Sequence, residues 1–309
     1  KSWLARPLKD IALIRRRQDA VEELAENRGI RVELQGLLNE VYDLERLMVR
    51  VSLGVANPRD LYSLKESLKV IPALRGTLEF FSSDLIASIR ASLDGVNEAV
   101  GIIDAAIADS PPVSTRDGGF IKEGYDRTLD DLRETGSGGK DWVAGLEARE
   151  RAATGINSLK VGYNRVFGYY IEVTKTNLSN VPAAYLRKQT LVNAERFVTP
   201  ALKEWEEKIL TAEERSRELE AEIFLAIVKE LASFHDRVHG TADLLATLDS
   251  IASLSQAAQE RGYVRPDVND SDSIFIEGGR HPVVEALTPD NFVANDLTLD
   301  GSCRFIILT

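Results

Sequence analysis

The segment from residue 156 to residue 200 interrupts a sequence that is otherwise helical in character. It is rich in β-branched and aromatic residues and is punctuated by glycines. Tyr169, Ile171 and Val173 alternate with residues of the opposite set, which is the two-residue period of a strand. Asn164-Arg165 lies between two strand-like runs, where a hairpin turn is expected. The pattern predicts a small β module inserted between two helical regions.

The same segment is basic, although the chain as a whole is acidic. It contains six lysines and arginines and two glutamates, a net charge of +4, whereas the 309 residues together carry −11. The remainder therefore sums to −15. This balance excludes a surface that binds nucleic acid everywhere, so any such contact is expected to be local to the module.

Composition narrows the class of protein further. No apolar run approaches the roughly 20 residues of a membrane span, and no secretory signal pattern is present. The single cysteine, Cys303, excludes an internal disulfide framework and fits a reducing compartment. The sequence starts without methionine and ends in an apolar run typical of a buried strand, so we expect a fragment of a longer protein.

Residues 1–110 have apolar positions at helical spacing throughout. They predict helices through residues 11–24, 34–51, 61–71 and 85–103, the third one starting at Asn57-Pro58. Three arginines, residues 15–17, are either a nucleic-acid patch or a solvated helix face. The neighbouring Asp10 and Asp19 favour the solvated face.

Two long helical patterns flank the β module. The first runs from Lys122 to Ala153, the second begins at Pro200, and the order helix, module, helix predicts an antiparallel coiled-coil arm with the module at its tip. Helices of about 30 residues would each span about 45 Å. The stripes are Tyr125, Leu129, Leu132, Gly136, Gly139, Val143 and Leu146 in the first pattern and Trp205, Ile209, Ala212, Leu219, Ile223 and Ala226 in the second. The predicted acidic outer face of the second helix is Glu213, Glu214, Glu218, Glu220 and Glu222.

Two motifs in these helices have alternative interpretations. The run Gly136–Gly139 predicts a kink or break in the first helix, because each glycine costs a helix about 1 kcal/mol relative to alanine. Together with Lys140 it could also be a phosphate loop, but P-loop spacing and a preceding strand are missing. His235 and His239, with Asp243 one turn further, have metal-ligand spacing, although surface histidines are the simpler interpretation.

The last part of the chain, from Tyr263, changes to short strands and turns. A strand is predicted over residues 273–277, strands and turns over 278–296, and a buried strand over 305–308. This order is typical of the beginning of an α/β domain.

Three stretches together resemble the MutS family of DNA mismatch-repair ATPases. They are LKVGYN with GYYI (residues 159–164 and 168–171), LRKQTLVNAERF (186–197), and GRHPVVE with FVAN (279–285 and 292–295). The opening runs WLARPL (3–8) and RQDAV (17–21) are similar to the core domain of the family. The resemblance covers essentially the whole chain, and none of these runs is a generic motif.

The resemblance implies a mainly α fold with a small β insertion: a helical core, a long antiparallel coiled-coil lever carrying a β-rich DNA clamp, and the first strands of an α/β ATPase domain. The implied parts are a helical core (1–121), an outgoing lever helix (122–155), the clamp (156–199), returning lever and core helices (200–262), and an incomplete ATPase domain (263–309). It further implies that the chain stops just before the P-loop and lacks the mismatch-reading and connector domains. A branch of the family has no clamp, so the clamp favours a mismatch-repair protein.

Carried over by position, the resemblance assigns candidate DNA-phosphate contacts in the clamp. Lysine and arginine supply charge there and asparagine supplies neutral donors, as phosphate oxygens require. The candidates are Lys160, Asn164, Lys175, Arg187, Lys188 and Asn193. Some of them are expected to be solvated and idle, and Arg196 to pair with Glu195 or Glu204. The aromatic residues Tyr163, Phe167, Tyr169 and Tyr170 either stack on bases or form the small core of the module, which is the favoured interpretation.

Phe292 resembles the aromatic residue that stacks on adenine in the family, with Val293 beside the ring. This half-site is incomplete, so we expect no enzyme activity and no bound cofactor in this chain, and ATP with Mg²⁺ in the intact protein. The expected partners are double-stranded DNA, other mismatch-repair proteins and, in the intact protein, a second copy of the chain. The fragment itself is expected to be a monomer. The intact protein is expected to be cytoplasmic and nucleoid-associated. The alternatives are a structural coiled-coil protein whose tip binds a protein, and a zinc enzyme built on His235 and His239.

Overall fold

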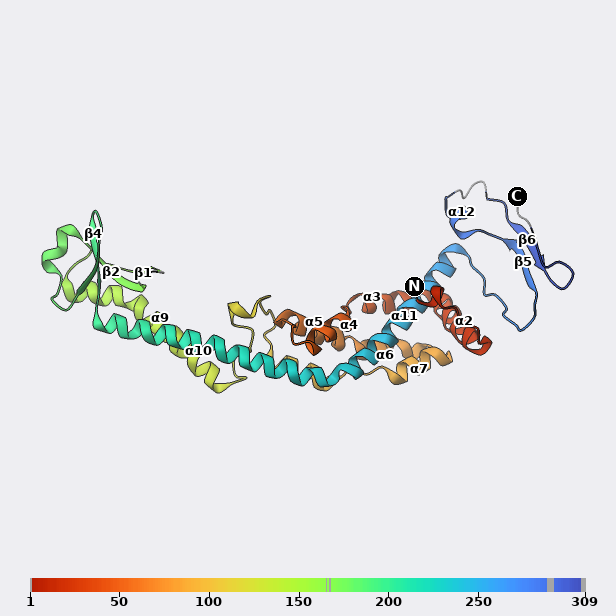
Figure 1. The fold of residues 1–309 in the computed structure, drawn as a ribbon, viewed down its shortest axis with the longest axis horizontal. Helices are drawn as coiled ribbons and strands as arrows, with labels where there is room; N and C mark the ends of the chain where they lie inside the picture. The colour runs from red at the N-terminus through yellow and green to blue at the C-terminus, as the bar shows by residue number, and fades with distance from the viewer. Residues whose placement is uncertain (1, 165, 167, 288–291, 307–309) are drawn as a thin grey trace. The chain divides into compact units, whose positions relative to one another are not determined.

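The computed structural model describes residues 2–164, 166, 168–287 and 292–306, and most of them are helical (Figure 1). The chain forms two compact units. Residues 1–31, 81–88 and 250–309 make up the first unit, and residues 32–80 and 89–249 the second. Within the described residues, none of the helices combines the length and the apolarity that crossing a bilayer requires.

The elements follow one another along the chain with small sheets between long helices. The helices are α1 (Ser2–Ala5), α2 (Ile11–Glu26), α3 (Arg28–Asn39), α4 (Leu44–Ser52), α5 (Pro58–Lys69), α6 (Ile71–Thr77), α7 (Asp84–Ser92), α8 (Asn97–Ala106), α9 (Arg127–Thr154), α10 (Pro200–Leu231), α11 (His235–Arg261) and α12 (Pro282–Leu287). The strands are β1 (Lys160–Asn164), β2 (Gly168–Thr174), β3 (Leu186–Thr190), β4 (Ala194–Val198), β5 (Ile274–Gly279) and β6 (Asn295–Leu299). Short 3₁₀ turns are η1 (Leu78–Phe80), η2 (Thr115–Asp117), η3 (Lys175–Asn180) and η4 (Ala232–Phe234).

Helices α4, α5, α6 and α8 form a packed group in the second unit, here called the body. Leu61, Leu64 and Leu68 follow the helical spacing read from the sequence and are at most 1% exposed. The predicted start of α5 at Asn57-Pro58 is confirmed, and it is a capping box. The Asn57 side chain accepts from Asp60 N at 3.0 Å, and the Asp60 carboxylate accepts from Asn57 N at 2.8 Å.

Two of the predicted helices are each divided, which the apolar spacing did not indicate. The pattern over 34–51 is α3 and α4, with a break at which Asp43 caps α4 by accepting from Arg46 N at 2.9 Å. The pattern over 85–103 is α7 and α8. Asp94 accepts from Val96 N at 2.8 Å there, and Val96 adopts a left-handed φ of 43°. An aspartate begins the second helix in the first case and binds the connecting backbone in the second, although the apolar period continues across both positions.

Helices α9 and α10 run antiparallel and lie side by side, forming what is here called the arm (Figure 1). Arg133 pairs with Glu220 near one end of α9, Lys140 with Glu213 further along, and the rings of Trp142 and Trp205 stack at 5.3 Å beyond them. Residue numbers rise along α9 as they fall along α10, which is the antiparallel order. The stripe predicted on α9 holds from Leu129 onward, whereas Tyr125 precedes the helix and is 42% exposed. Leu132 is half-buried, and the buried members are Leu129, Gly136, Gly139, Val143 and Leu146.

A break at Gly136–Gly139, one of the two predicted possibilities, is wrong because α9 continues through these residues as a helix. A Cβ atom at Gly139 would overlap Cγ1 of Ile209, so the absence of a side chain lets α10 approach closely. The helix propensity lost at this position is offset by packing between the helices. The phosphate-loop interpretation is wrong as well, since Lys140 is helical and its Nζ lies 2.7 Å from Glu213.

The stripe predicted on α10 holds only for its first half. Ile209 and Ala212 are buried, but further along Glu220, Phe224 and Ile227 are buried in place of the predicted Leu219, Ile223 and Ala226. The buried face rotates because α10 leaves α9 and packs against the loop before α9 and against the body. Glu220 was predicted on the solvated face and is 2% exposed.

The β module is a four-stranded antiparallel sheet, here called the tip sheet, with strand order β1-β2-β4-β3. The predicted hairpin is confirmed by the pairing of Asn164 with Gly168, while Arg165 of the predicted turn lies outside the described residues. One sheet face packs on the arm. Its core joins Ile171, Val173 and Phe197 of the sheet to Val143, Leu146, Leu202 and Ile209 of the arm.

The first unit places α2 against the segment after α11. Arg15 donates to Val268 O at 2.9 Å, Gln18 donates to Pro266 O at 2.8 Å, and Arg265 lies 2.6 Å from Asp19. The three arginines are therefore not a merely solvated face: Arg16 donates to Asp84 O, and the Arg17 guanidinium lies 3.5 Å from the centre of the Trp3 ring.

The last part of the chain is less strand-rich than predicted. The strand over 273–277 is confirmed as β5, which pairs with β6. Residues 282–287 are helical where strands and turns were predicted, and the His281 ring accepts from Val284 N at 3.3 Å at the helix start. Phe305 and Ile306 are in no strand, because no strand pairs with them among the described residues; Ile307 and Leu308 lie outside those residues.

Candidate nucleic-acid interface

Both arm helices hold the tip sheet through carboxylates. Glu147 of α9 accepts from Val161 N of the edge strand β1 at 3.0 Å. Glu206 of α10 accepts from Tyr169 N of β2 at 3.2 Å, and it lies where a Cβ of Gly168 would be. Gly168 has a φ of 73°, so a side chain there would be strained as well as crowded. The direction of the sheet is therefore coupled to both helices.

The two faces of the tip sheet differ in chemistry, because directly paired residues share a face and neighbours alternate. The inner face carries the apolar core described above. The outer face carries a row across all four strands, in which Lys160 pairs with Glu172, Glu172 with Arg196, and Arg196 with Gln189. The outer face is thus polar and contains alternating charges.

Arg196 is the centre of this row. Its guanidinium donates to Glu172 at 2.9 Å and to Gln189 at 3.0 Å, and lies 4.1 Å from the centre of the Tyr170 ring. The predicted partners, Glu195 and Glu204, were wrong. Pairing with Glu172 depends on the register of β2 and β4, which residue spacing along the chain does not reveal.

The six predicted DNA-contacting residues lie on the two edges and one end of the sheet. Lys160 and Asn164 are on the edge strand β1, and Arg187 and Lys188 are on the opposite edge strand β3. Lys175 and Asn193 meet at one end of the sheet, where Lys175 N donates to Asn193 O at 3.1 Å. Asn164 is half-buried and the other five are exposed.

Lys188 has a particular position, because it lies at a β-bulge. Arg187 pairs with Phe197 and Gln189 with Arg196, so Lys188 is the additional residue between them. A bulge on an edge strand redirects a side chain away from the regular alternation.

The side chains of Asn164 and Arg187 also have a structural role. The Asn164 side-chain oxygen accepts from Val166 N at 2.8 Å in the hairpin connection. Arg187 Nη1 lies 3.3 Å from a carboxylate oxygen of Glu195, a residue that is 8% exposed. Arg187 therefore compensates a buried charge whether or not it contacts a ligand.

The aromatic side chains divide between the two interpretations made from the sequence. Tyr169 packs on the sheet core, and its ring centre lies 4.9 Å from that of Tyr163, which is half exposed. Tyr170 lies on the outer face, stacked on Arg196 and covering Gly162. Phe167 lies outside the described residues. Core packing is confirmed for Tyr169, whereas Tyr170 is a polar-face residue.

Tyr185 of the β2–β3 connection is a contact that the sequence reasoning missed. Its hydroxyl donates to Glu150 of α9 at 2.6 Å, and its ring packs on Phe197. Burial and the hydrogen bond to Glu150 raise the pKa of Tyr185 well above its usual range, so it remains a donor at physiological pH.

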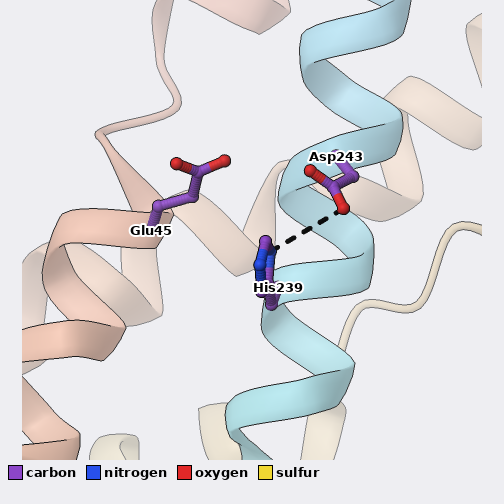
Figure 2. Close-up of side chains that lie close together, drawn as sticks. All are labelled: Glu45, His239 and Asp243. Atoms are coloured by element: carbon purple, nitrogen blue, oxygen red, sulfur yellow. Dashed lines mark ion pairs between the residues drawn. The ribbon is translucent and has the colours of Figure 1, made fainter.

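His235 and His239 have different neighbours, and those of His239 are drawn in Figure 2. Glu45 of α4 lies beside His239 and Asp243 of α11, with possible ligand atoms within 4.8 Å of one another; His239 Nδ1 is 3.8 Å from Asp243. His235 Nδ1 instead lies 3.1 Å from the Ser52 hydroxyl. All three side chains of the trio are exposed, whereas metal ligands are normally oriented by a second shell of hydrogen bonds, so we assign no metal to it.

The residues of the predicted nucleotide half-site precede β6. Phe292 is half-buried and Val293 is 73% exposed.

Comparison with known proteins identifies the family of this chain. Residues 1–255 match the family model of MutS domain III. Proteins named DNA mismatch repair protein MutS are similar over essentially the whole chain. Those of Symbiobacterium thermophilum and Salinibacter ruber are each 47% identical over 100% of this chain, and that of Methanothrix thermoacetophila is 47% identical over 99% of it. The chain spans about a third of the length of these curated relatives, 34–36% in each case. On the strength of the match over residues 1–255, this chain belongs to the MutS domain III family.

Proposed function

We propose that this chain is the duplex-binding part of a DNA mismatch-repair protein, and that the tip sheet grips the phosphate backbone. The observation that supports this most directly is the separation of charge. A segment of net charge +4 forms a small sheet at the end of the arm, in a chain of net charge −11. Phosphate contacts supply most of the affinity of binding that does not depend on base sequence.

The geometry of the sheet supports contacts on both of its edges. Four strands spaced about 4.8 Å apart separate β1 from β3 by about 14 Å, which is on the scale of the DNA major groove at about 12 Å. Lys160 lies on one edge and Lys188, at its bulge, on the other. Lys175 and Asn193 add a cation and a neutral donor at the end between these edges.

In this proposal α9 and α10 are the lever and the tip sheet is the clamp. The lever would couple the position of the clamp to an ATPase domain that uses ATP and Mg²⁺ in the longer protein. Phe292 and Val293 would contribute one side of the nucleotide site there. The longer protein would form a homodimer and would act together with other mismatch-repair proteins. This chain would grip DNA without distinguishing matched from mismatched base pairs.

The test is fluorescence anisotropy of the purified chain with a labelled duplex across a salt series. About four phosphate contacts give a slope near −4 in log K against log salt, at about −0.9 per phosphate. The variant is Lys175→Glu with Lys188→Glu, which spares Arg187 because reversing that charge would also leave Glu195 unpaired. The matched control is Arg46→Glu with Lys229→Glu, the same change in charge on α4 and at the body end of α10.

Salt-steep binding that the tip variant loses and the control variant retains is the expected result. Equal loss in both variants would mean that overall charge, and not the tip, governs binding. Absence of duplex binding at low salt would favour the alternative, in which the tip of a structural helical arm binds a protein.

A further inference from the structure

We propose that Glu220 is a positioning residue that sets the axial register of α9 against α10, and through it the direction of the tip sheet. The inference depends on the proposed function only in its last step, the consequence for DNA affinity. Glu220 lies on α10, is 2% exposed, and belongs to none of the candidate contacts with DNA.

The Glu220 carboxylate accepts hydrogen bonds from three consecutive backbone amides in the loop before α9. Gly119 N, Phe120 N and Ile121 N donate to its two oxygens at 2.9, 2.8 and 2.9 Å. Arg133 of α9 donates to it at 2.8 Å, and the same Arg133 nitrogen donates to Ile121 O at 3.0 Å. One buried charge thus holds the loop and α9 to α10 at a single point.

The loop is in turn fastened to the body. Ala108 N donates to Phe120 O at 2.9 Å, and Lys122 N donates to Ala106 O at 2.8 Å, on both sides of the bridge between Ile107 and Ile121. Phe120 is fully buried and its ring meets Phe224 of α10 edge to face at 5.4 Å. Because α8 ends at Ala106, the loop joins the body to the start of α9.

At the opposite end of the arm, the orientation of the tip sheet depends on the axial register between α9 and α10, because each helix holds a different strand. Glu147 lies about 20 Å along α9 from Arg133, at 1.5 Å per residue. It binds the β1 backbone, while Glu206 of α10 binds the β2 backbone. A slip of α9 along α10 would move these two anchors in opposite directions and tilt the sheet.

Glu220→Gln tests this inference, with Glu222→Gln, an exposed position on the same helix, as the matched control. Amide hydrogen exchange is followed at Gly119, Phe120 and Ile121, and at Val161 and Tyr169 of the tip. We expect exchange to become at least about tenfold faster at both places in Glu220→Gln, the effect of weakening hydrogen bonds to a charged acceptor, and to remain unchanged in the control.

Duplex affinity is measured on the same variants. Glu220→Gln is expected to bind at least about threefold more weakly with an unchanged salt slope, because the phosphate contacts are misdirected and not removed. Faster exchange at residues 119–121 with unchanged exchange at Val161 and Tyr169 would overturn the inference, since Glu220 would then stabilise only the loop that it contacts.

A second variant keeps the test valid if Glu220→Gln does not fold. Arg133→Met removes the guanidinium nitrogen that donates to both Ile121 O and Glu220, and methionine favours a helix about as well as arginine does. It should give the same two exchange effects, and no effect at the tip would overturn the inference. If the wild-type chain binds no duplex, the proposed function fails while the exchange data still decide the role of Glu220.

Discussion

Asp94 lies between α7 and α8 and holds the chain there with both its side chain and its carbonyl group. The side chain accepts from Val96 N and from Arg237 at 2.7 Å, and the carbonyl accepts from Thr241 at 2.8 Å. These contacts stabilise the left-handed Val96, a conformation that β-branched residues rarely adopt. A helix predicted to continue is divided because side chains from α11 bind the connection.

The stability of the body should depend on the charge of Asp94. Hydrogen bonds from Arg237 hold the pKa of Asp94 below its ordinary value. The charged form therefore adds stability above the pKa of the unfolded state, about 3.9, and this is lost as pH falls through the lower folded value. We expect Asp94→Asn to lower the free energy of unfolding by about 1 kcal/mol at pH 7, a modest amount because the pair is partly exposed.

Urea unfolding at pH 7 and at pH 3 measures this difference. The difference in the free energy of unfolding between wild type and Asp94→Asn should be smaller at pH 3 than at pH 7. The control is Asp131→Asn, at an exposed position on α9, which should differ little from wild type at either pH. A gap that stays constant with pH would show that the ionised carboxylate is not the source of the stability.

At the scale of elements, α9 shows how packing overrides local preference. The glycines from residue 136 to 139 predict a break, yet α9 is continuous because α10 lies against it. Gly139 is required by that contact, whereas Gly138 is exposed and has nothing within 4 Å of where its Cβ would be. The two neighbouring glycines therefore have different physical roles.

Alanine substitution should separate these roles. Gly138→Ala is expected to raise the free energy of unfolding by up to about 1 kcal/mol, since alanine favours the helix and meets no neighbour. Gly139→Ala should lower it by about 1–3 kcal/mol, because its methyl group would overlap Ile209. Urea midpoints decide the question, and a loss of stability in Gly138→Ala would contradict this account of α9.

At the scale of the whole molecule, the distribution of charge and the family relationship both support the proposed role in binding duplex DNA. The basic tip and the acidic remainder were evident from the sequence, and the family match covers residues 1–255. The segment after residue 262 contributes β5, β6 and the proposed nucleotide half-site. The sequence contains no GxxxxGK[ST] run, the pattern whose amides and lysine bind phosphates.

We therefore expect this chain to bind matched and mismatched duplexes with equal affinity and to hydrolyse no ATP. Anisotropy with paired duplexes that differ at one base pair tests the first expectation. Phosphate release by the purified chain, compared with a buffer blank and with the chain plus duplex, tests the second. Turnover above the blank would contradict the proposed division between this chain and the rest of the longer protein.

The sequence alone determined the features that depend on neighbouring residues. Apolar spacing identified α2, α5, α9 and α10, strand alternation identified the tip hairpin, and the local charge marked the tip, because each is a property of a few consecutive turns or strands. The six candidate contacts came from the resemblance to the MutS family, and they lie on the edges and one end of a single sheet.

Only the tertiary structure decided which groups distant along the chain meet. Glu220 is buried because it binds Gly119, 101 residues away, and Asp94 is held by Arg237, 143 residues away. Arg196 binds Glu172 because of the register between β2 and β4. Desolvation and hydrogen bonding depend on these approaches in space, and residue spacing along the chain contains no record of them.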